Sequence, residues 1–70
     1  MPNLVEFHLL RLQDKSVEVR LRSINELRLL GDPVALPELE RLYRSDPDPE
    51  VRKAAQAAGR ELFQKKKSQA

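Results

Sequence analysis

The stretch Asp14–Pro33, DKSVEVRLRSINELRLLGDP, decides the fold because a second copy of it follows 32 residues later. When the chain is aligned with itself at this offset, nine of the 28 pairs from 4/36 to 31/63 are identical. Three of the identical pairs are Asp14/Asp46, Val19/Val51 and Arg20/Arg52. A fixed period of this length is typical of proteins built from stacked structural repeats. The sequence therefore predicts two stacked copies of one unit.

Length and composition limit what the chain can be. Its 70 residues form one domain at most, and a chain this short buries only about 60% of the surface that it exposes when unfolded. It has no cysteine, which excludes disulfide bonds and thiolate-bound zinc. Charged residues make up 34% of the chain, but the net charge is only +2. No apolar run reaches the roughly 20 residues of a membrane span and no signal-peptide pattern is visible, so we expect a cytoplasmic protein.

Local signals in the chain predict helices and no strand. The four expected helices cover residues 3–13, 17–30, 34–44 and 49–64. Ser16 is a good N-cap for the second helix, and Gly31 can adopt the left-handed conformation that often ends a helix. Asp48 and Pro49 form a strong start for the fourth helix. The chain is therefore expected to be all-α.

The helices group into one domain, which we place at residues 3–64. The first repeat is expected at about residues 3–31 and the second at about 32–64, because the aligned pairs begin and end near these positions. The C-terminal residues 65–70, KKKSQA, are expected to form a disordered basic tail.

The turn and helix-start residues of both units carry a resemblance to a known family. Each second helix begins E-V-R after a turn with an aspartate, and the first copy ends L-G-D-P before another helix. This pattern resembles HEAT repeats, and it is most similar to short HEAT-like repeats of the phycobilisome-lyase type. The matching residues are Asp14, Val19, Arg20, Ser23, Leu27, Leu30, Gly31, Asp32, Pro33, Ala35, Leu36, Pro37 and Leu39, then Asp46, Val51, Arg52, Ala54, Ala55, Ala58 and Leu62.

The resemblance implies an α-α superhelix, a HEAT-like solenoid made of two helical hairpins. It also implies a role in holding other proteins, although some members of the family handle bilin chromophores and some larger relatives bind DNA. Fold alone does not choose among these ligands.

Differences between the two units predict how they stack. Ala54 and Ala58 occupy the positions that Arg22 and Glu26 occupy in the first unit. These small residues would let the second repeat approach the first closely, so Arg22 and Glu26 should face solvent at the N-terminal edge. Ile24 should then be buried between the repeats, and its counterpart Gln56 should lie at the C-terminal edge. Because terminal repeats of a solenoid need polar outer edges, we expect a complete two-repeat unit.

The first helix carries two apolar stripes. The stripe that aligns with leucines of the second unit is expected in the core and consists of Leu4, Phe7 and Leu10. The other stripe has no apolar counterpart and consists of Val5, Leu9 and Leu12. A helix that is apolar on two faces usually buries both, and two repeats are fewer than usual, so we predict self-association through this second stripe. The alternative is that the helix tilts and tucks the stripe under its own fold.

Two charged residues recur in each unit, as Asp14 and Arg20 and again as Asp46 and Arg52. In HEAT-like repeats such residues commonly link neighbouring turns by charge-assisted hydrogen bonds, which predicts a structural role for all four. His8 is the only histidine, and a single imidazole without cysteine makes a poor metal site. We therefore expect no catalytic residue, no metal and no cofactor.

The exposed line of the second helices is the predicted partner-binding strip, Leu21, Arg28, Lys53 and Arg60. The basic residues of this strip suit an acidic segment of another protein, while a plain solvated helix face is the alternative. The sequence thus predicts a non-enzymatic protein-interaction module that self-associates. Other readings are an accessory subunit of a bilin-lyase system, or weak nucleic-acid binding through the strip and Lys65–Lys67. Nucleic-acid binding is disfavoured because no stacking aromatic or groove-reading motif accompanies the basic residues.

Overall fold

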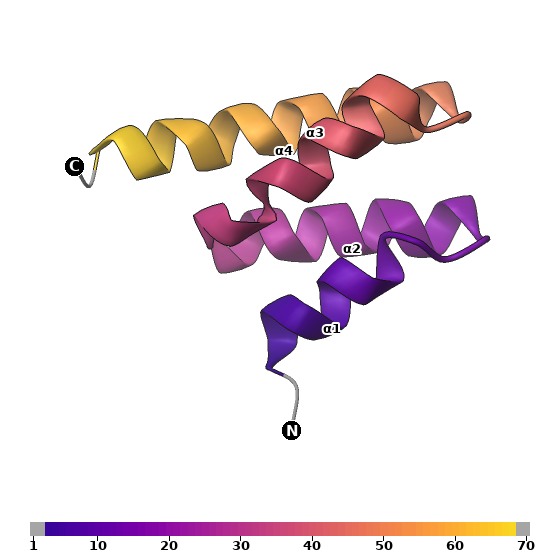
Figure 1. Ribbon diagram of the computed structural model, residues 1–70, viewed down its shortest axis with the longest axis horizontal. Helices are drawn as coiled ribbons and strands as arrows, with labels where there is room; N and C mark the ends of the chain where they lie inside the picture. The colour runs from indigo at the N-terminus through magenta and orange to yellow at the C-terminus, as the bar shows by residue number, and fades with distance from the viewer. Residues whose placement is uncertain (1–2, 69–70) are drawn as a thin grey trace.

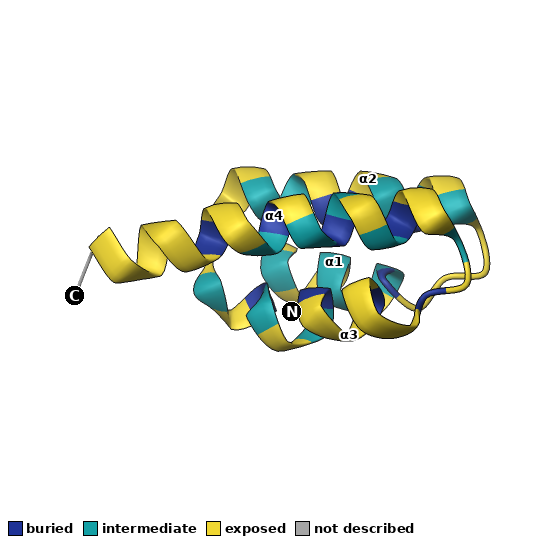
Figure 2. Cartoon of the chain, turned by 90° about the horizontal axis from the view of Figure 1, so that it is seen from above, coloured by how far each residue is buried: buried dark blue, intermediate teal, exposed yellow. Residues whose placement is uncertain are grey.

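The computed structural model describes residues 3–68, which form two stacked helical hairpins (Figure 1). The elements of this part of the chain are α1 (Leu4–Arg11), α2 (Val17–Leu30), the short 3₁₀ helix η1 (Pro33–Ala35), α3 (Leu36–Ser45) and α4 (Pro49–Ser68). Seen from above, α2 and α4 form one layer, and α1 and α3 form the other (Figure 2). No residue from 3 to 68 is in a strand, so the all-α prediction is confirmed.

The ends of the helices follow from their capping residues. The Ser16 hydroxyl accepts a hydrogen bond from the Val19 amide at 3.3 Å at the start of α2. Gly31 ends α2 with φ 70°, in the left-handed region that residues with a side chain rarely adopt. The Asp48 carboxylate accepts from the Glu50 and Val51 amides at 2.8 and 3.1 Å at the start of α4. These three predicted boundaries are confirmed.

The third helix begins later than predicted, at Leu36, because Pro37 has no amide proton. In a continuous α-helix the Pro33 carbonyl would accept a hydrogen bond from residue 37. Here the Leu36 amide donates to that carbonyl instead, and the chain makes a 3₁₀ turn over Pro33–Ala35. The Asp32 carboxylate accepts from the Val34 amide at 2.9 Å and holds the turn in place.

The fourth helix is longer than predicted, which corrects the expected disordered tail. It continues through Lys65–Lys67 to Ser68, while residues 69 and 70 lie outside the described part of the chain. Lysine is a good helix former, and cations near a helix C-terminus interact favourably with the helix dipole. The Lys65 side chain also lies against Gly31, so this part of α4 contacts the end of α2.

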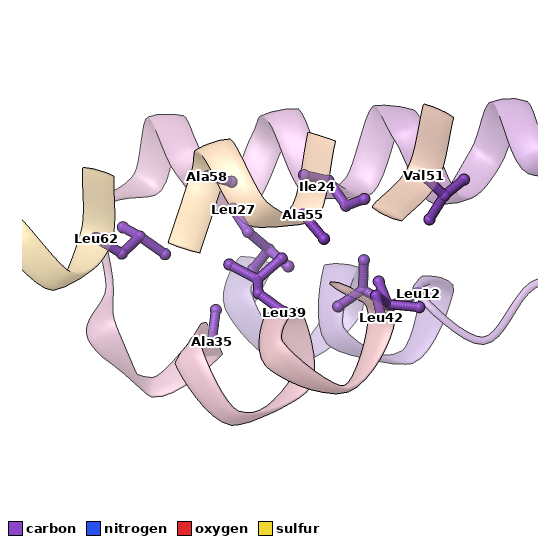
Figure 3. Close-up of a cluster of buried hydrophobic side chains, with 10 residues drawn as sticks. All are labelled: Leu12, Ile24, Leu27, Ala35, Leu39, Leu42, Val51, Ala55, Ala58 and Leu62. Atoms are coloured by element: carbon purple, nitrogen blue, oxygen red, sulfur yellow. The ribbon is translucent and has the colours of Figure 1, made fainter. Parts of the chain in front are cut away.

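The core lies between the two layers and is built from both repeats (Figure 3). Its buried apolar residues are Leu12, Ile24, Leu27, Ala35, Leu39, Leu42, Val51, Ala55, Ala58 and Leu62. The predictions from the differences between the units hold for the two most informative positions, since Ile24 is 2% exposed and Arg22 is exposed. Ala58 is buried at the contact with the first repeat, while Glu26 and Gln56 are half-buried at the outer edges.

The two apolar stripes of α1 are exchanged relative to the prediction. Leu4, Phe7 and Leu10, expected in the core, are 63%, 44% and 69% exposed. The stripe assigned to self-association faces the second repeat instead: Leu12 is 1% exposed, and Val5 and Leu9 are half-buried against the core. The predicted interface through Val5, Leu9 and Leu12 is therefore wrong.

The position of α1 at the start of the stack explains why its two apolar stripes are exchanged. In α3 the residues equivalent to the exposed stripe pack on the preceding repeat, so Leu39 and Leu42 are buried. Within residues 3–68, no element precedes α1. The side of α1 that faces away from the second repeat therefore has no neighbour in the described chain. We call this side of the molecule the N-terminal edge, and the opposite side, beyond α3 and α4, the C-terminal edge.

Ser23 is a buried polar residue whose replacement should stabilise the fold. Its side chain is 1% exposed, and the hydroxyl has no hydrogen-bond partner within the described chain, while the second repeat has Ala55 at this position. We expect Ser23→Ala to raise the free energy of unfolding by about 1 kcal/mol, because an unpaired buried hydroxyl costs stability. Urea denaturation followed by circular dichroism measures this change. Ala55→Ser is the matched control and should lower stability; a loss of stability in Ser23→Ala would show that the hydroxyl is bonded.

Candidate functional site

The repeated charged residues meet where the two turns of the hairpins lie next to each other. One Arg20 Nη donates to the backbone carbonyls of Asp14 and Lys15 at 2.8 and 3.1 Å. The other donates to Asp46 Oδ1 at 3.1 Å, and Arg20 Nε lies 2.9 Å from Asp46 Oδ2. The Nε contact is an ion pair that lacks hydrogen-bond alignment. Arg20 is 8% and Asp46 is 6% exposed, so this pair joins the two repeats inside the protein.

The other two members of the repeated set make only half of these contacts. The Asp14 carboxylate accepts from the Ser16 amide at 2.8 Å, just as the Asp46 carboxylate accepts from the Asp48 amide at 2.9 Å. Arg52 donates to the Asp46 carbonyl at 2.7 Å, just as Arg20 donates to the Asp14 carbonyl. Among residues 3–68, neither Asp14 nor Arg52 takes part in an ion pair. The structure therefore brings Arg20 and Asp46 together and leaves Asp14 and Arg52 apart.

The predicted partner-binding strip is divided by the structure. Leu21 is half-buried and packs against the core, so it offers little free surface. Arg28 is held by Asn25, to which it donates at 2.8 Å, and by Glu61 of α4 at 3.4 Å. Lys53 and Arg60 are exposed, and the described residues provide neither with an ion-pair partner. The two residues of α4 are thus the accessible part of the strip.

A third basic residue extends this accessible part, and the sequence reasoning missed it. Lys67 lies seven residues beyond Arg60, as Arg60 lies seven residues beyond Lys53. At 3.6 residues per turn, this spacing places all three on one face of α4, with about 10 Å between neighbours. That face is opposite the buried residues of the helix, and Lys67 is exposed. We call Lys53, Arg60 and Lys67 the basic line. The sequence predicts that this helix ends near residue 64, which places Lys67 in the expected tail.

The C-terminal edge contains a groove that sequence reasoning also missed. A hollow of about 720 Å³ lies between α3 and α4, and its apolar lining includes Leu36, Tyr43, Gly59 and Phe63. Tyr43 and Phe63 are 44% and 55% exposed at this groove. The sequence contains a signal of this groove, because the counterparts of Tyr43 and Phe63 in the first repeat, Arg11 and Gly31, are not aromatic.

Residues that could carry chemistry do not gather in one place within the described chain. No group of three or more His, Cys, Asp or Glu side chains in residues 3–68 is arranged to hold a metal ion. The His8 ring packs edge-on against Phe7 with 5.0 Å between ring centroids, and its Nδ1 is buried without a hydrogen-bond partner in this part of the chain. None of the helices described is long and apolar enough to cross a membrane.

Comparison with known proteins identifies the family. A family model described as HEAT repeats matches residues 2–59, which is most of the chain. The chain belongs to the HEAT-repeat family. The stacked hairpins are therefore HEAT repeats, and the predicted helical-hairpin solenoid is confirmed. HEAT repeats generally mediate protein–protein interaction. Neither the curated proteins nor the solved structures gave a match.

Proposed function

We propose that this HEAT module is a non-enzymatic scaffold that binds an acidic segment of another protein along the basic line of α4. The observation that carries the proposal is the accessibility of these charges. Lys53, Arg60 and Lys67 are exposed and have no ion-pair partner within residues 3–68, whereas Arg41 and Arg44 of α3 pair with Glu38 and Glu40. Free cations in a row favour a ligand with carboxylates in a row.

The spacing of the basic line matches a peptide in extended conformation. In an extended peptide of polyproline II conformation, residues three apart lie on one face and are separated by about 9 Å, close to the distance between neighbours of the line. An acidic segment with a carboxylate at every third position could therefore contact all three cations. Each exposed ion pair contributes at most about 1 kcal/mol, so affinity requires several together and should fall with salt.

The alternatives considered from the sequence gain no specific support. Lys65–Lys67 are part of α4, where successive side chains point about 100° apart, so they do not form one face for nucleic acid. No observation in the described residues favours a bilin over other ligands. The cytoplasmic location stays a prediction from the sequence.

Charge reversal on α4 tests the proposal. We expect Lys53→Glu/Arg60→Glu to weaken binding of a fluorescein-labelled oligo-glutamate peptide at least tenfold, about 1.4 kcal/mol, because two attractions become repulsions. Fluorescence anisotropy at low and physiological salt measures the affinity, with oligo-glutamine as the neutral probe.

A matched control separates the site from the overall charge. Arg41→Glu/Arg44→Glu makes the same change in net charge on α3, in the other layer of the molecule. This control should retain most of the affinity. Equal losses in the two double variants would show that the peptide senses only net charge, and the proposed site would be wrong.

A further inference from the structure

An ion pair joins the two repeats, and each outer edge of the molecule carries the equivalent of one of its two residues. Within the chain, Arg20 of the first repeat pairs with Asp46 of the second. Asp14 is the equivalent of Asp46, has the same turn hydrogen bond, and is exposed at the N-terminal edge. Arg52 is the equivalent of Arg20 and has the same bond to a turn carbonyl, but no carboxylate of residues 3–68 pairs with it. One edge thus offers the acceptor and the other the donor.

The apolar surfaces of the two edges are also complementary. The N-terminal edge presents the exposed stripe of α1, Leu4, Phe7 and Leu10, while the C-terminal edge presents the groove between α3 and α4. Within the chain, Leu27 and Leu39 are buried in one cluster, and their side chains point toward each other (Figure 3). The equivalents at the outer edges are Gly59 in the groove and Phe7 on α1.

This change in size is partly compensated across the contact. A Cβ added to Gly59 would meet no atom within 4 Å, so the groove is open where Leu27 fills the internal contact. Phe7 is correspondingly larger than the Leu39 that it replaces. A larger side chain on one edge would thus face a smaller one on the other, and this offsets part of the volume lost at Gly59.

The charged residues of the two outer edges are also complementary. Leu12 of the first repeat borders Glu38 and Leu42 of the second, around a hollow at the repeat junction. The equivalents at the outer edges are Arg44 on the C-terminal side, and Glu6 and Leu10 on the N-terminal side. The leucine beside a glutamate inside the chain thus corresponds to an arginine, paired with Glu40 of its own chain, that would lie beside Glu6 of the next copy, which favours association of unlike edges.

We propose that copies of this chain stack head-to-tail, with the N-terminal edge of one copy seated in the C-terminal groove of the next. Phe7 enters the groove beside Gly59, and Arg52 pairs with Asp14 of the neighbouring copy. The step between copies repeats the step between repeats. Such a contact is heterologous, so the assembly grows beyond a dimer unless it closes into a ring. This inference is argued without the basic line, but Arg60 of that line also borders the groove, so stacking would cover one of its three cations.

Two variants, each blocking one edge, test the stacking by sedimentation velocity. The wild-type chain should show an average mass that rises with concentration past that of a dimer. Phe7→Glu blocks the N-terminal edge and Phe63→Glu blocks the groove; each variant alone should be monomeric. An equimolar mixture should form a dimer and nothing larger, because one intact edge of each kind remains.

Two other outcomes would contradict head-to-tail stacking. If the first variant is monomeric but Phe63→Glu still dimerises alone, the N-terminal edges pair with each other in a two-fold dimer and head-to-tail stacking is overturned. A wild-type chain that stays monomeric overturns it as well.

Controls keep the test independent of folding. Both phenylalanines are about half exposed and lie outside the buried core, and thermal unfolding of dilute samples should match the wild type. Leu10→Glu, at a position 69% exposed, is a second block of the N-terminal edge and must behave like Phe7→Glu. Ala57→Glu introduces the same charge at an exposed position of α4, and should assemble like the wild type.

Discussion

Arg20→Ala is expected to lower the free energy of unfolding by about 3–5 kcal/mol, because it leaves the buried carboxylate of Asp46 without its cation. The guanidinium makes three hydrogen bonds and one further ion-pair contact, which link α2 to the turn carbonyls before it and to the carboxylate of the second repeat. A folded chain of this length has a stability of about 4–10 kcal/mol. The variant should therefore lose a large part of this stability.

Urea denaturation followed by far-ultraviolet circular dichroism measures this loss, and Arg52→Ala is the matched control. Arg52 has the same position in the second repeat and the same hydrogen bond to a turn carbonyl, but it has no carboxylate partner in the described chain. Its removal should cost only about 1 kcal/mol, the typical net worth of one hydrogen bond. Equal losses in both variants would mean that the carbonyl contacts, and not the pair with Asp46, hold the repeats together.

A double-mutant cycle with Asp46→Ala refines the interpretation. The two residues are in direct contact, so their effects should not add, and the double variant should be more stable than the sum of the single losses predicts. Such non-additivity would show that most of the cost of Arg20→Ala is the uncompensated carboxylate. It would not measure the net worth of the pair relative to an apolar contact.

The features that the sequence predicted correctly depend on local chemistry. Ser16, Gly31 and Asp48 bound their helices through hydrogen bonds and backbone conformations that involve residues at most four apart. The exchange of Ile24 for Gln56 predicted which side of α2 meets the second repeat, because one repeat could be compared with the other. The internal repeat thus supplied long-range information that a single copy would lack.

The two largest errors concern the ends of the stack and of the last helix. The repeat alignment placed Leu4, Phe7 and Leu10 in the core because their counterparts in α3 are leucines, but burial in α3 depends on a preceding repeat. The N-terminal edge has no preceding repeat in the described chain, and this exposes the stripe of α1 as it exposes Arg22 of α2. The run of lysines at the C-terminus predicts a disordered tail, but helix propensity and the contact of Lys65 with Gly31 favour a longer helix. That error hid the third residue of the basic line.

The assignment of the two faces of α1 leads to the second large effect. We expect Leu12→Ala to lower the free energy of unfolding by about 2–4 kcal/mol, whereas Leu10→Ala should change it by less than about 0.5 kcal/mol. Leu12 is 1% exposed in the core, and its truncation leaves a cavity between the repeats; Leu10 is 69% exposed. The repeat alignment alone would have predicted the reverse order. Urea denaturation of both variants decides between the two assignments.

The protein concentration must be low in this comparison, because head-to-tail stacking would bury Leu10 and give its truncation a cost. At low concentration, a larger loss for Leu10→Ala than for Leu12→Ala would return the exposed stripe to the core and remove the apolar N-terminal edge. If instead Leu10→Ala becomes destabilising only as the concentration rises, the cost belongs to association, since binding to the folded state stabilises it by mass action. The same pair of variants therefore tests the fold of the monomer and the surface through which it assembles.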